Sequence, residues 1–247
     1  MMIVEMAQET HATLRYLQAC KRALPAEIRL NRRTNTLFNK VITATLTELK
    51  RTGQVPGDAS VVRGITSAFD QYGPKILEEI AKETVRQAQQ GRSRTLQEAG
   101  LYTILRDKVP LPDQTYNLIK NRAFEASAQT LTRMRGDVME VLAQSYREGH
   151  GIDKAANLLK DKFVSMRDYE LVRIARTEIN SGQNQGAYET ERELHINYHM
   201  WWSADDDRVR DGTTSDADHT YMHGQIVRVG DPFSNGLLYP GDMSGPI

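Results

Sequence analysis

The sequence holds a single cysteine, Cys20, among its 247 residues. One thiol cannot form a disulfide within the chain, and it cannot supply the several thiolates of a cysteine zinc cluster. Cys20 lies in "YLQACKRAL", a helix-like run in which a buried structural cysteine is expected rather than a nucleophile. We therefore expect no disulfide framework, no thiolate metal centre and no cysteine enzyme.

Aromatic residues are scarce, at 7% of the chain, and no apolar run approaches the roughly 20 residues of a membrane helix. The first residues, "MMIVEMAQETHATLRY", lack the basic segment and the long apolar run of a signal peptide. We therefore expect a protein that is made in the cytoplasm and has no membrane partner. A glycine loop of the kind that cradles phosphates is also missing from the sequence, and we expect no cofactor.

The chain has no net charge, because 32 basic residues balance 32 acidic ones, but the charge is unevenly placed. Residues 15–63 hold ten basic and three acidic side chains, whereas residues 201–247 hold three basic and eight acidic ones. The basic segment 21–40 predicts contacts with DNA phosphates or, alternatively, a solvated or partner-facing helix. It lacks the interleaved aromatics that stack on bases, so only non-specific backbone contact is indicated. The candidate residues are Lys21, Arg22, Arg29, Arg32, Arg33 and Lys40.

Most of the first 194 residues show helical periodicity, and residues that typically start or stop helices suggest where the helices end. Pro25 suits a first helical turn, Gly53 a helix end and Asp58 a helix cap, while Gly73-Pro74 predicts a break. The run "KVPLPDQ" predicts a linker, and "GHG" at 149–151 predicts the end of a long helix. From these limits we expect three regions: an N-terminal helical region (1–110), long helices (111–194) and a tail module (195–247).

The tail module has a different composition from the helices, since "HINYHMWWSA" and "QIVRVG" resemble short strands separated by turn-forming residues. The predicted fold class is therefore mainly α, with an extended helical N-terminal part followed by a small, loop-rich α+β C-terminal module. About 50 residues form only a small core, so the module should lean on the preceding helix or on a partner.

Four histidines of the tail stand in pairs with four-residue spacing, His195 with His199 and His219 with His223. This spacing occurs in zinc hydrolases, but in neither pair does a glutamate directly follow the first histidine, as the HExxH pattern requires. The nearby carboxylates could add oxygen ligands, which leaves a metal-dependent hydrolase or nuclease open as an alternative. Those carboxylates are Asp205, Asp206, Asp207, Asp216 and Asp218. The competing interpretation is that these polar side chains bond to turns and strand ends.

The order of short motifs in the C-terminal part resembles the phage head-morphogenesis family, the minor head proteins similar to protein F of phage Mu. The motifs are "IARTEINSGQNQGAYETERE", a tryptophan, "DDRVRD", "HTYMHG", "VGDPF" and "LYPGD". The matching positions are Arg176, Thr177, Glu178, Trp202, Asp207, Arg208, Arg210, His219, Gly224, Asp231, Pro232, Phe233, Tyr239, Pro240, Gly241 and Asp242. Relatives usually have an acidic residue where His223 stands, which weakens His219 and His223 as a metal pair.

Two of the matching residues also suggest how the small module is held together. Arg208 and Arg210 face the same side of an extended strand and can each make bidentate bonds to a carboxylate. Asp207 or Asp231 would be the partners, with Trp202 and Phe233 as the apolar centre.

The resemblance implies a structural virion protein and not an enzyme. It implies a minor head component inside the capsid near the portal vertex, which supports head assembly, DNA packaging or genome delivery. Its partners would be the portal protein, other head proteins and possibly packaged double-stranded DNA.

Overall fold

The structure is a computed structural model that describes residues 2–101, 109–203 and 218–242. Within these ranges, the side chains of residues 2–23 and of His219 are not described. None of the helices in these ranges combines the length and the hydropathy that a membrane span requires.

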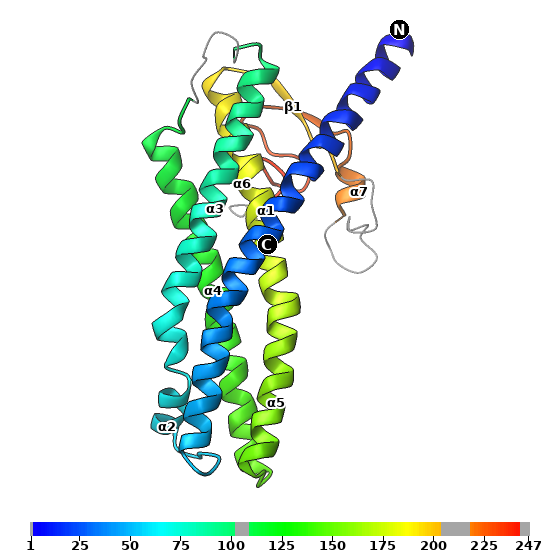
Figure 1. Ribbon diagram of the computed structural model, residues 1–247. Coiled ribbons are helices and arrows are strands. Elements are labelled where there is room, and N and C mark those ends of the chain that lie inside the picture. The colour runs from blue at the N-terminus through cyan, green and yellow to red at the C-terminus, as the bar shows by residue number, and fades with distance from the viewer. Residues whose placement is uncertain (1, 102–108, 204–217, 243–247) are drawn as a thin grey trace. The chain divides into compact units, whose positions relative to one another are not determined.

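Long helices make up most of the chain, and a two-stranded sheet lies near its C-terminal end (Figure 1). The predicted mainly α fold class, with a small α+β C-terminal region, is thereby confirmed. In chain order the elements are α1 (Met2–Arg51), α2 (Ala59–Ile65), α3 (Ala68–Glu98), α4 (Asp113–Arg147), α5 (Ile152–Ser165), the π-helical η1 (Met166–Leu171), α6 (Val172–Glu193), β1 (Tyr198–Met200), α7 (His219–Met222) and β2 (Ile226–Arg228).

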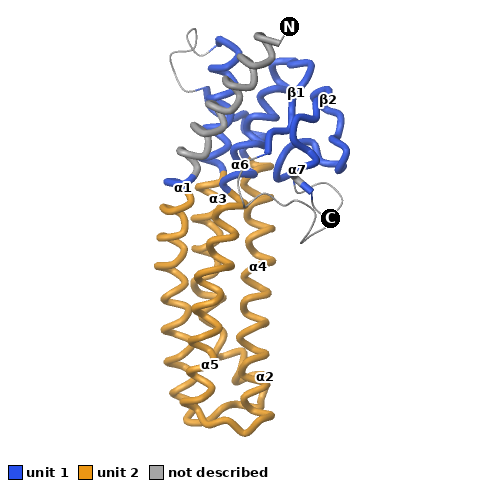
Figure 2. Tube along the Cα trace, turned by 90° about the vertical axis from the view of Figure 1, so that its right-hand side faces the viewer, with its two compact units in different colours: residues 1–26, 85–116, 179–247 blue, residues 27–84, 117–178 orange. Residues whose placement is uncertain are grey.

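The chain forms two compact units, each built from segments that are separate in the sequence (Figure 2). Unit 1 comprises residues 1–26, 85–116 and 179–247, and unit 2 comprises residues 27–84 and 117–178. The predicted regions 1–110, 111–194 and 195–247 are each continuous in the sequence, whereas the two compact units are not. The units therefore do not test this division, which stays a prediction.

Unit 2 is a helical bundle whose buried positions repeat every 11 residues. On α1 the buried positions are Leu30, Thr34, Phe38, Val41, Thr45 and Leu49, so residues 11 apart recur on one stripe. On α4 they include Ala123, Ser127, Leu131, Met134, Val138, Leu142 and Ser145, which obey the same rule. An 11-residue repeat corresponds to about 3.67 residues per turn, close to the straight helix, and favours a straight or slightly right-handed bundle.

Phe38 marks the point at which three helices of unit 2 meet. Its ring packs edge-on against Phe69 of α3 at 6.3 Å and against Phe163 of α5 at 5.9 Å between centroids. Edge-to-face pairs of this kind add to the hydrophobic gain from burial. Three of the five phenylalanines of the chain thus pack together at one point of the bundle.

Two helix limits predicted from proline are wrong, because Pro25 lies inside α1 and Pro74 lies inside α3. A proline inside a helix forfeits one backbone hydrogen bond. Around Pro74, however, the side chains of Phe69, Ile76 and Ile80 are buried. Burying each of these apolar side chains is worth about 1.5–3 kcal/mol, which outweighs the lost bond.

Other predicted limits are confirmed. Gly53 follows the end of α1 with φ +73°, and the Asp58 side chain caps α2 by accepting the Ser60 amide at 2.7 Å. Residues 109–112 separate α3 from α4, and α4 ends just before Gly149 to Gly151. Gly, Asp and Pro thus predicted helix ends correctly where no large buried stripe continued past them.

Candidate functional site

The tail of unit 1 is built around a short antiparallel ribbon. Tyr198, His199 and Met200 of β1 pair with Arg228, Val227 and Ile226 of β2, respectively. One face of the ribbon covers a small core made of Trp201, Met222 and Phe233. Trp201 is 2% exposed and its ring meets Phe233 edge-on at 5.2 Å. The predicted apolar centre was therefore right for Phe233 and wrong for Trp202.

Trp202 lies beside the core and packs on a histidine. Neighbouring residues of an extended chain point to opposite sides, so only one of the two tryptophans can face the core. The ring of Trp202 contacts the ring of His223, with centroids 4.5 Å apart. The Ser203 amide donates to Nδ1 of the same histidine at 3.3 Å, so this lone pair already has a partner.

The "LYPGD" segment is fastened to α6 by two side-chain donors. The Ser181 hydroxyl donates to the Gly241 carbonyl at 2.7 Å, and the Asn184 amide donates to the Pro240 carbonyl at 2.9 Å. One turn further along α6, the ring of Tyr188 packs on Tyr239 at 5.0 Å. Two segments singled out by the resemblance, the helix with "NSGQNQGAY" and the tail with "LYPGD", therefore contact each other directly.

The glycine and the aspartate of this segment have distinct local roles. Gly241 has φ +79°, and a Cβ there would lie 3.2 Å from Ser181 Cα. A left-handed residue this close to a helix is best occupied by glycine. The Asp242 side chain is buried and accepts the Leu238 amide at 3.0 Å, which closes the turn around Pro240.

His199 is part of the same assembly rather than half of a metal pair. Its ring stacks on Phe233 at 5.0 Å and lies 5.7 Å from the ring of Tyr188. Its Nδ1 lies 3.1 Å from a carboxylate oxygen of Glu191 on α6. Its predicted companion His195 follows α6 with φ +53°. Within the described ranges, no group of three or more His, Cys, Asp or Glu side chains could hold a metal ion.

The other predicted metal residues give less information. His219 begins α7 and its side chain is not described, while Asp205, Asp206, Asp207 and Asp216 lie outside the described residues. Asp218 is the N-cap of α7, where its carboxylate accepts the Tyr221 amide at 2.8 Å. Such a capping bond is the structural alternative to metal binding that the sequence also allowed for this aspartate.

Of the helical motif residues, Glu178 is the buried one. Its side chain is 3% exposed and lies 3.5 Å from both Arg122 Nη2 and Thr84 Oγ1. Burial raises the pKa of Glu178 to about 7, although Arg122 and the Thr84 bond act in the opposite direction. Arg176 lies on the exposed side, 3.8 Å from a Glu27 oxygen, and Thr177 is exposed.

The remaining motif residues are placed as follows. Gly224 follows α7 with φ +81° and donates its amide to the Trp201 carbonyl at 2.9 Å. Asp231 and Pro232 are exposed. Arg208 and Arg210 lie outside the described residues, so their carboxylate pairs stay a prediction.

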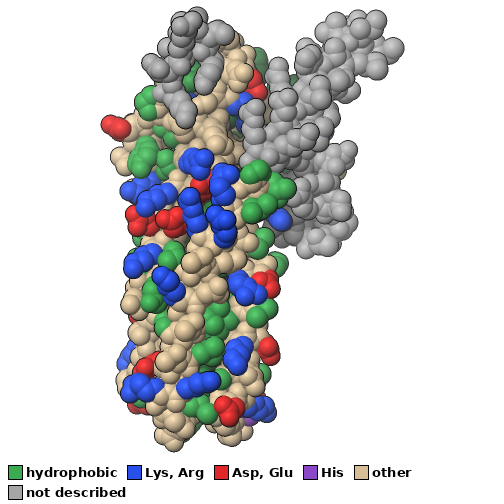
Figure 3. Space-filling model, viewed as in Figure 1, with side chains coloured by type: hydrophobic (Ala, Val, Ile, Leu, Met, Phe, Trp, Pro, Cys, Tyr) green, Lys and Arg blue, Asp and Glu red, His purple; other side chains and the backbone are tan. Residues whose placement is uncertain are grey.

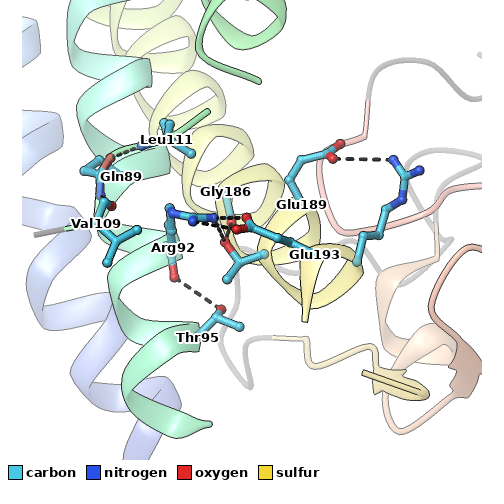
Figure 4. A network of polar contacts seen from close by, with 11 residues as sticks. Gln89, Arg92, Thr95, Val109, Leu111, Gly186, Glu189 and Glu193 are labelled. Carbon is cyan, nitrogen blue, oxygen red and sulfur yellow. Dashed lines mark hydrogen bonds and ion pairs between the residues drawn. The ribbon is translucent and has the colours of Figure 1, made fainter. Parts of the chain in front are cut away.

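The structure adds a polar network that sequence reasoning missed (Figure 4). Arg92 of α3 is 3% exposed and binds Glu193 of α6 through both terminal nitrogens, one of them at 3.0 Å. It also donates to the Thr190 hydroxyl at 3.3 Å. Three positions earlier, Gln89 donates to the Val109 carbonyl at 2.6 Å and accepts the Leu111 amide at 2.8 Å. Contacts between residues about 100 positions apart leave no local signal in the sequence.

The candidate DNA-contacting residues fall into two groups. Lys21 and Arg22 lie in the first part of α1, residues 2–23, whose side chains are not described. Arg29 lies 3.5 Å from Glu83 and Arg33 lies 3.4 Å from Glu79, while Arg32 and Lys40 are exposed.

Comparison with known proteins gives a match to a protein family. None of the curated proteins and none of the solved structures compared with the chain matches it significantly. Residues 136–244 match the family described as Phage Mu protein F like protein. This range contains both the α6 helix and the "LYPGD" segment that docks on it. The match confirms the resemblance found in the sequence: residues 136–244, the C-terminal part of the chain, are similar to the phage Mu protein F-like family.

Proposed function

We propose that this protein is a structural minor head protein that is attached to the portal inside the phage capsid. The observation that supports the proposal most is the family match over residues 136–244. In this proposal the tail module, fastened to α6 through Ser181 and Asn184, forms the folded anchor. The helices of unit 2 would extend the contact to other head proteins, and the protein would support head assembly, packaging or genome delivery.

The chemistry of the described part of the tail supports a structural role over a catalytic one. His199 and His223 have their Nδ1 atoms engaged by Glu191 and by the Ser203 amide. Asp218 and Asp242 accept backbone amides that close a helix end and a turn. Side chains used in this way stabilise the local fold.

The test is to mix the purified chain with the portal protein of the same phage and to measure the mass of the complex by size-exclusion light scattering. Metal analysis of the same sample examines the alternative of a hydrolase that uses His219, His223 and the aspartates. A complex of defined stoichiometry without bound metal supports the proposal. A folded chain that forms no complex and holds one metal ion per chain would instead favour the enzyme.

A substitution in the tail sharpens this test. We expect Arg208→Ala to unfold the tail module or to abolish the complex, because this arginine is proposed to stabilise the module through bonds to a carboxylate. Arg63→Ala, on the exposed surface of α2, is the matched control and should bind normally. Portal binding by a folded Arg208→Ala variant at wild-type strength would contradict the proposed role.

A further inference from the structure

The seam between α1 and α3 in unit 2 presents a concentration of positive charge. Its cations lie at helical spacing on the two helices: Arg29, Arg32, Arg33 and Lys40 on α1, and Lys75 and Lys82 on α3. We call this surface the α1–α3 seam. Lys and Arg side chains gather over these two helices in Figure 3, with carboxylates between them. The α3 lysines were not among the candidates named from the sequence, since they lie far from segment 21–40.

Two of the three carboxylates of the seam, Glu79 and Glu83, are less exposed than the cations they pair with, whereas Glu78 is as exposed as Lys82. Glu79 lies 3.4 Å from Arg33 and 4.0 Å from Lys82, but its side chain is only 29% exposed. Glu83, which pairs with Arg29, is 3% exposed. The cations themselves are more exposed, Arg33 at 50% and Lys82 at 59%. The six cations of the seam outnumber its three carboxylates, Glu78, Glu79 and Glu83, so the seam has a net positive charge.

One pair of cations on the seam shares an aromatic ring. The Nζ atoms of Lys40 and Lys75 lie 6.0 and 5.9 Å from the centroid of the Tyr72 ring. Neither lysine forms an ion pair with any side chain in the described part of the protein. Both lysines are exposed, so a phosphate from solvent can approach either ammonium group.

We propose that the α1–α3 seam binds backbone phosphates of double-stranded DNA without sequence preference. Residues 29 to 40 of α1 span about 16 Å, so the cations form a row of the kind that follows a phosphate backbone. A protein partner is disfavoured, since protein interfaces have an apolar or aromatic centre, whereas charged side chains predominate on the seam and Tyr72 is half-buried among them. Packaged DNA is the polyanion that a head protein meets, so the inference extends the proposed function without requiring a portal contact.

The experiment measures binding of the full chain to a fluorescent 30-base-pair duplex by anisotropy, over a range of about 50–200 mM salt. At physiological salt we expect a Kd of about 1–100 µM, the range of non-specific binding, with affinity falling steeply as salt rises. The double variant Lys40→Gln/Lys75→Gln should bind several-fold more weakly. The slope of the logarithm of its binding constant against the logarithm of salt concentration should be smaller in magnitude by about 1.8, since each lost phosphate contact removes about 0.9.

Two matched variants separate this site from general electrostatics. Lys154→Gln/Lys160→Gln removes the same charge from exposed positions on α5 and should bind like the wild type. Lys40→Arg/Lys75→Arg keeps the charge and should also bind like the wild type. Circular dichroism shows whether each variant is folded before its binding is measured.

Three results would overturn the inference: an unchanged salt slope in the glutamine variant, an equal loss in the α5 control, or displacement of the duplex by poly-glutamate at equal charge concentration. The last result would identify a site for acidic protein instead. The portal experiment is done separately at about 0.5 M salt, where phosphate contacts are weak. A portal complex without DNA binding therefore rejects this inference alone, and DNA binding without a complex rejects the proposed function alone.

Discussion

At the scale of single residues, Glu178 is a buried carboxyl group that makes the stability of unit 2 depend on pH. Its carboxyl group has an ordinary pKa of 4.5 in the unfolded chain, and burial raises the pKa to about 7 in the folded protein. The folded state therefore binds the proton more tightly than the unfolded state does. The stability that Glu178 contributes is fully present below pH 4.5 and is lost as pH rises through 7, with a total on the order of 3 kcal/mol.

We predict that Glu178→Gln makes unit 2 more stable at pH 8 and flattens the decline between pH 5 and pH 8. Glutamine keeps the size and can accept a hydrogen bond from Thr84, but it never ionises. Chemical denaturation at several pH values measures the effect. Glu125→Gln, an exposed position on α4, is the control and should retain the wild-type pH dependence. Equal pH dependence in Glu178→Gln and the wild type would show that another group is responsible.

The two adjacent tryptophans should respond differently to substitution. Trp201 fills the tail core with Met222 and Phe233, whereas Trp202 is only partly buried against His223. We predict a loss of about 3–5 kcal/mol for Trp201→Ala, the usual cost of removing a buried ring, and a clearly smaller loss for Trp202→Ala. Thermal unfolding followed by near-ultraviolet circular dichroism compares them. A larger effect at Trp202 would reverse the assignment.

This pair also shows what a sequence cannot decide at the residue scale. The sequence led us to expect Trp202 and Phe233 at the centre of the tail. Choosing between Trp201 and Trp202 requires the register of β1 against β2, and a shift of one residue exchanges the two faces of a strand. In the same way, the spacing of His195 and His199 was visible, but the contact of His199 with Glu191 was not.

At the scale of elements, α3 and α6 in unit 1 approach each other closely enough that backbone meets backbone. A Cβ at Gly91 would lie 2.0 Å from the Gln183 carbonyl oxygen, and one at Gly186 would lie 2.0 Å from the Ala88 carbonyl oxygen. Gln87 and Gln183 bridge the same crossing with a side-chain bond of 2.7 Å. Glycine is therefore required at two positions because only a bare backbone fits there.

We predict that Gly186→Ala destabilises unit 1 by about 3 kcal/mol or more, since the new methyl group must push the two helices apart. Gly136→Ala is the control, because a Cβ at that position in α4 meets nothing within 4 Å. The control should raise stability by about 0.5–1 kcal/mol through its better helix propensity. Melting temperatures from circular dichroism compare the variants. Similar changes in the two would mean that the crossing tolerates a side chain.

The elements themselves were largely predictable, whereas their assembly was not. Helical periodicity and terminal signals such as Gly53 and Asp58 are local, so the sequence displays them directly. The helix through Pro74 was missed because its stabilising burial comes from other helices. The discontinuous units were missed for the same reason, since pairs such as Arg92 with Glu193 join residues distant in the chain.

At the scale of the whole molecule, a zero net charge conceals two oppositely charged units. Unit 2 contains 20 basic and 16 acidic residues, and unit 1 contains 12 basic and 16 acidic residues. The units therefore have net charges of +4 and −4, respectively. Such a distribution favours attraction between copies, because unit 1 of one copy complements unit 2 of another.

We predict that the purified protein self-associates reversibly near pH 7 at low ionic strength. At about 0.01 M salt charges interact over roughly 30 Å, whereas at 1 M they interact over roughly 3 Å. Sedimentation velocity should show a larger average mass at low salt and a smaller one at high salt. A mass that does not depend on salt would contradict an electrostatic origin.

The 11-residue repeat on α1 and α4 has a consequence for how such a bundle can change its length. Removing or adding three or four residues in one helix shifts the later side chains relative to the buried stripe and changes the local winding, whereas 11 residues restore the register in full. Three helical turns, about 16 Å, are thus the smallest step that leaves the core in phase. Variants of unit 2 that differ in length and keep the same core packing should therefore differ by whole multiples of that step.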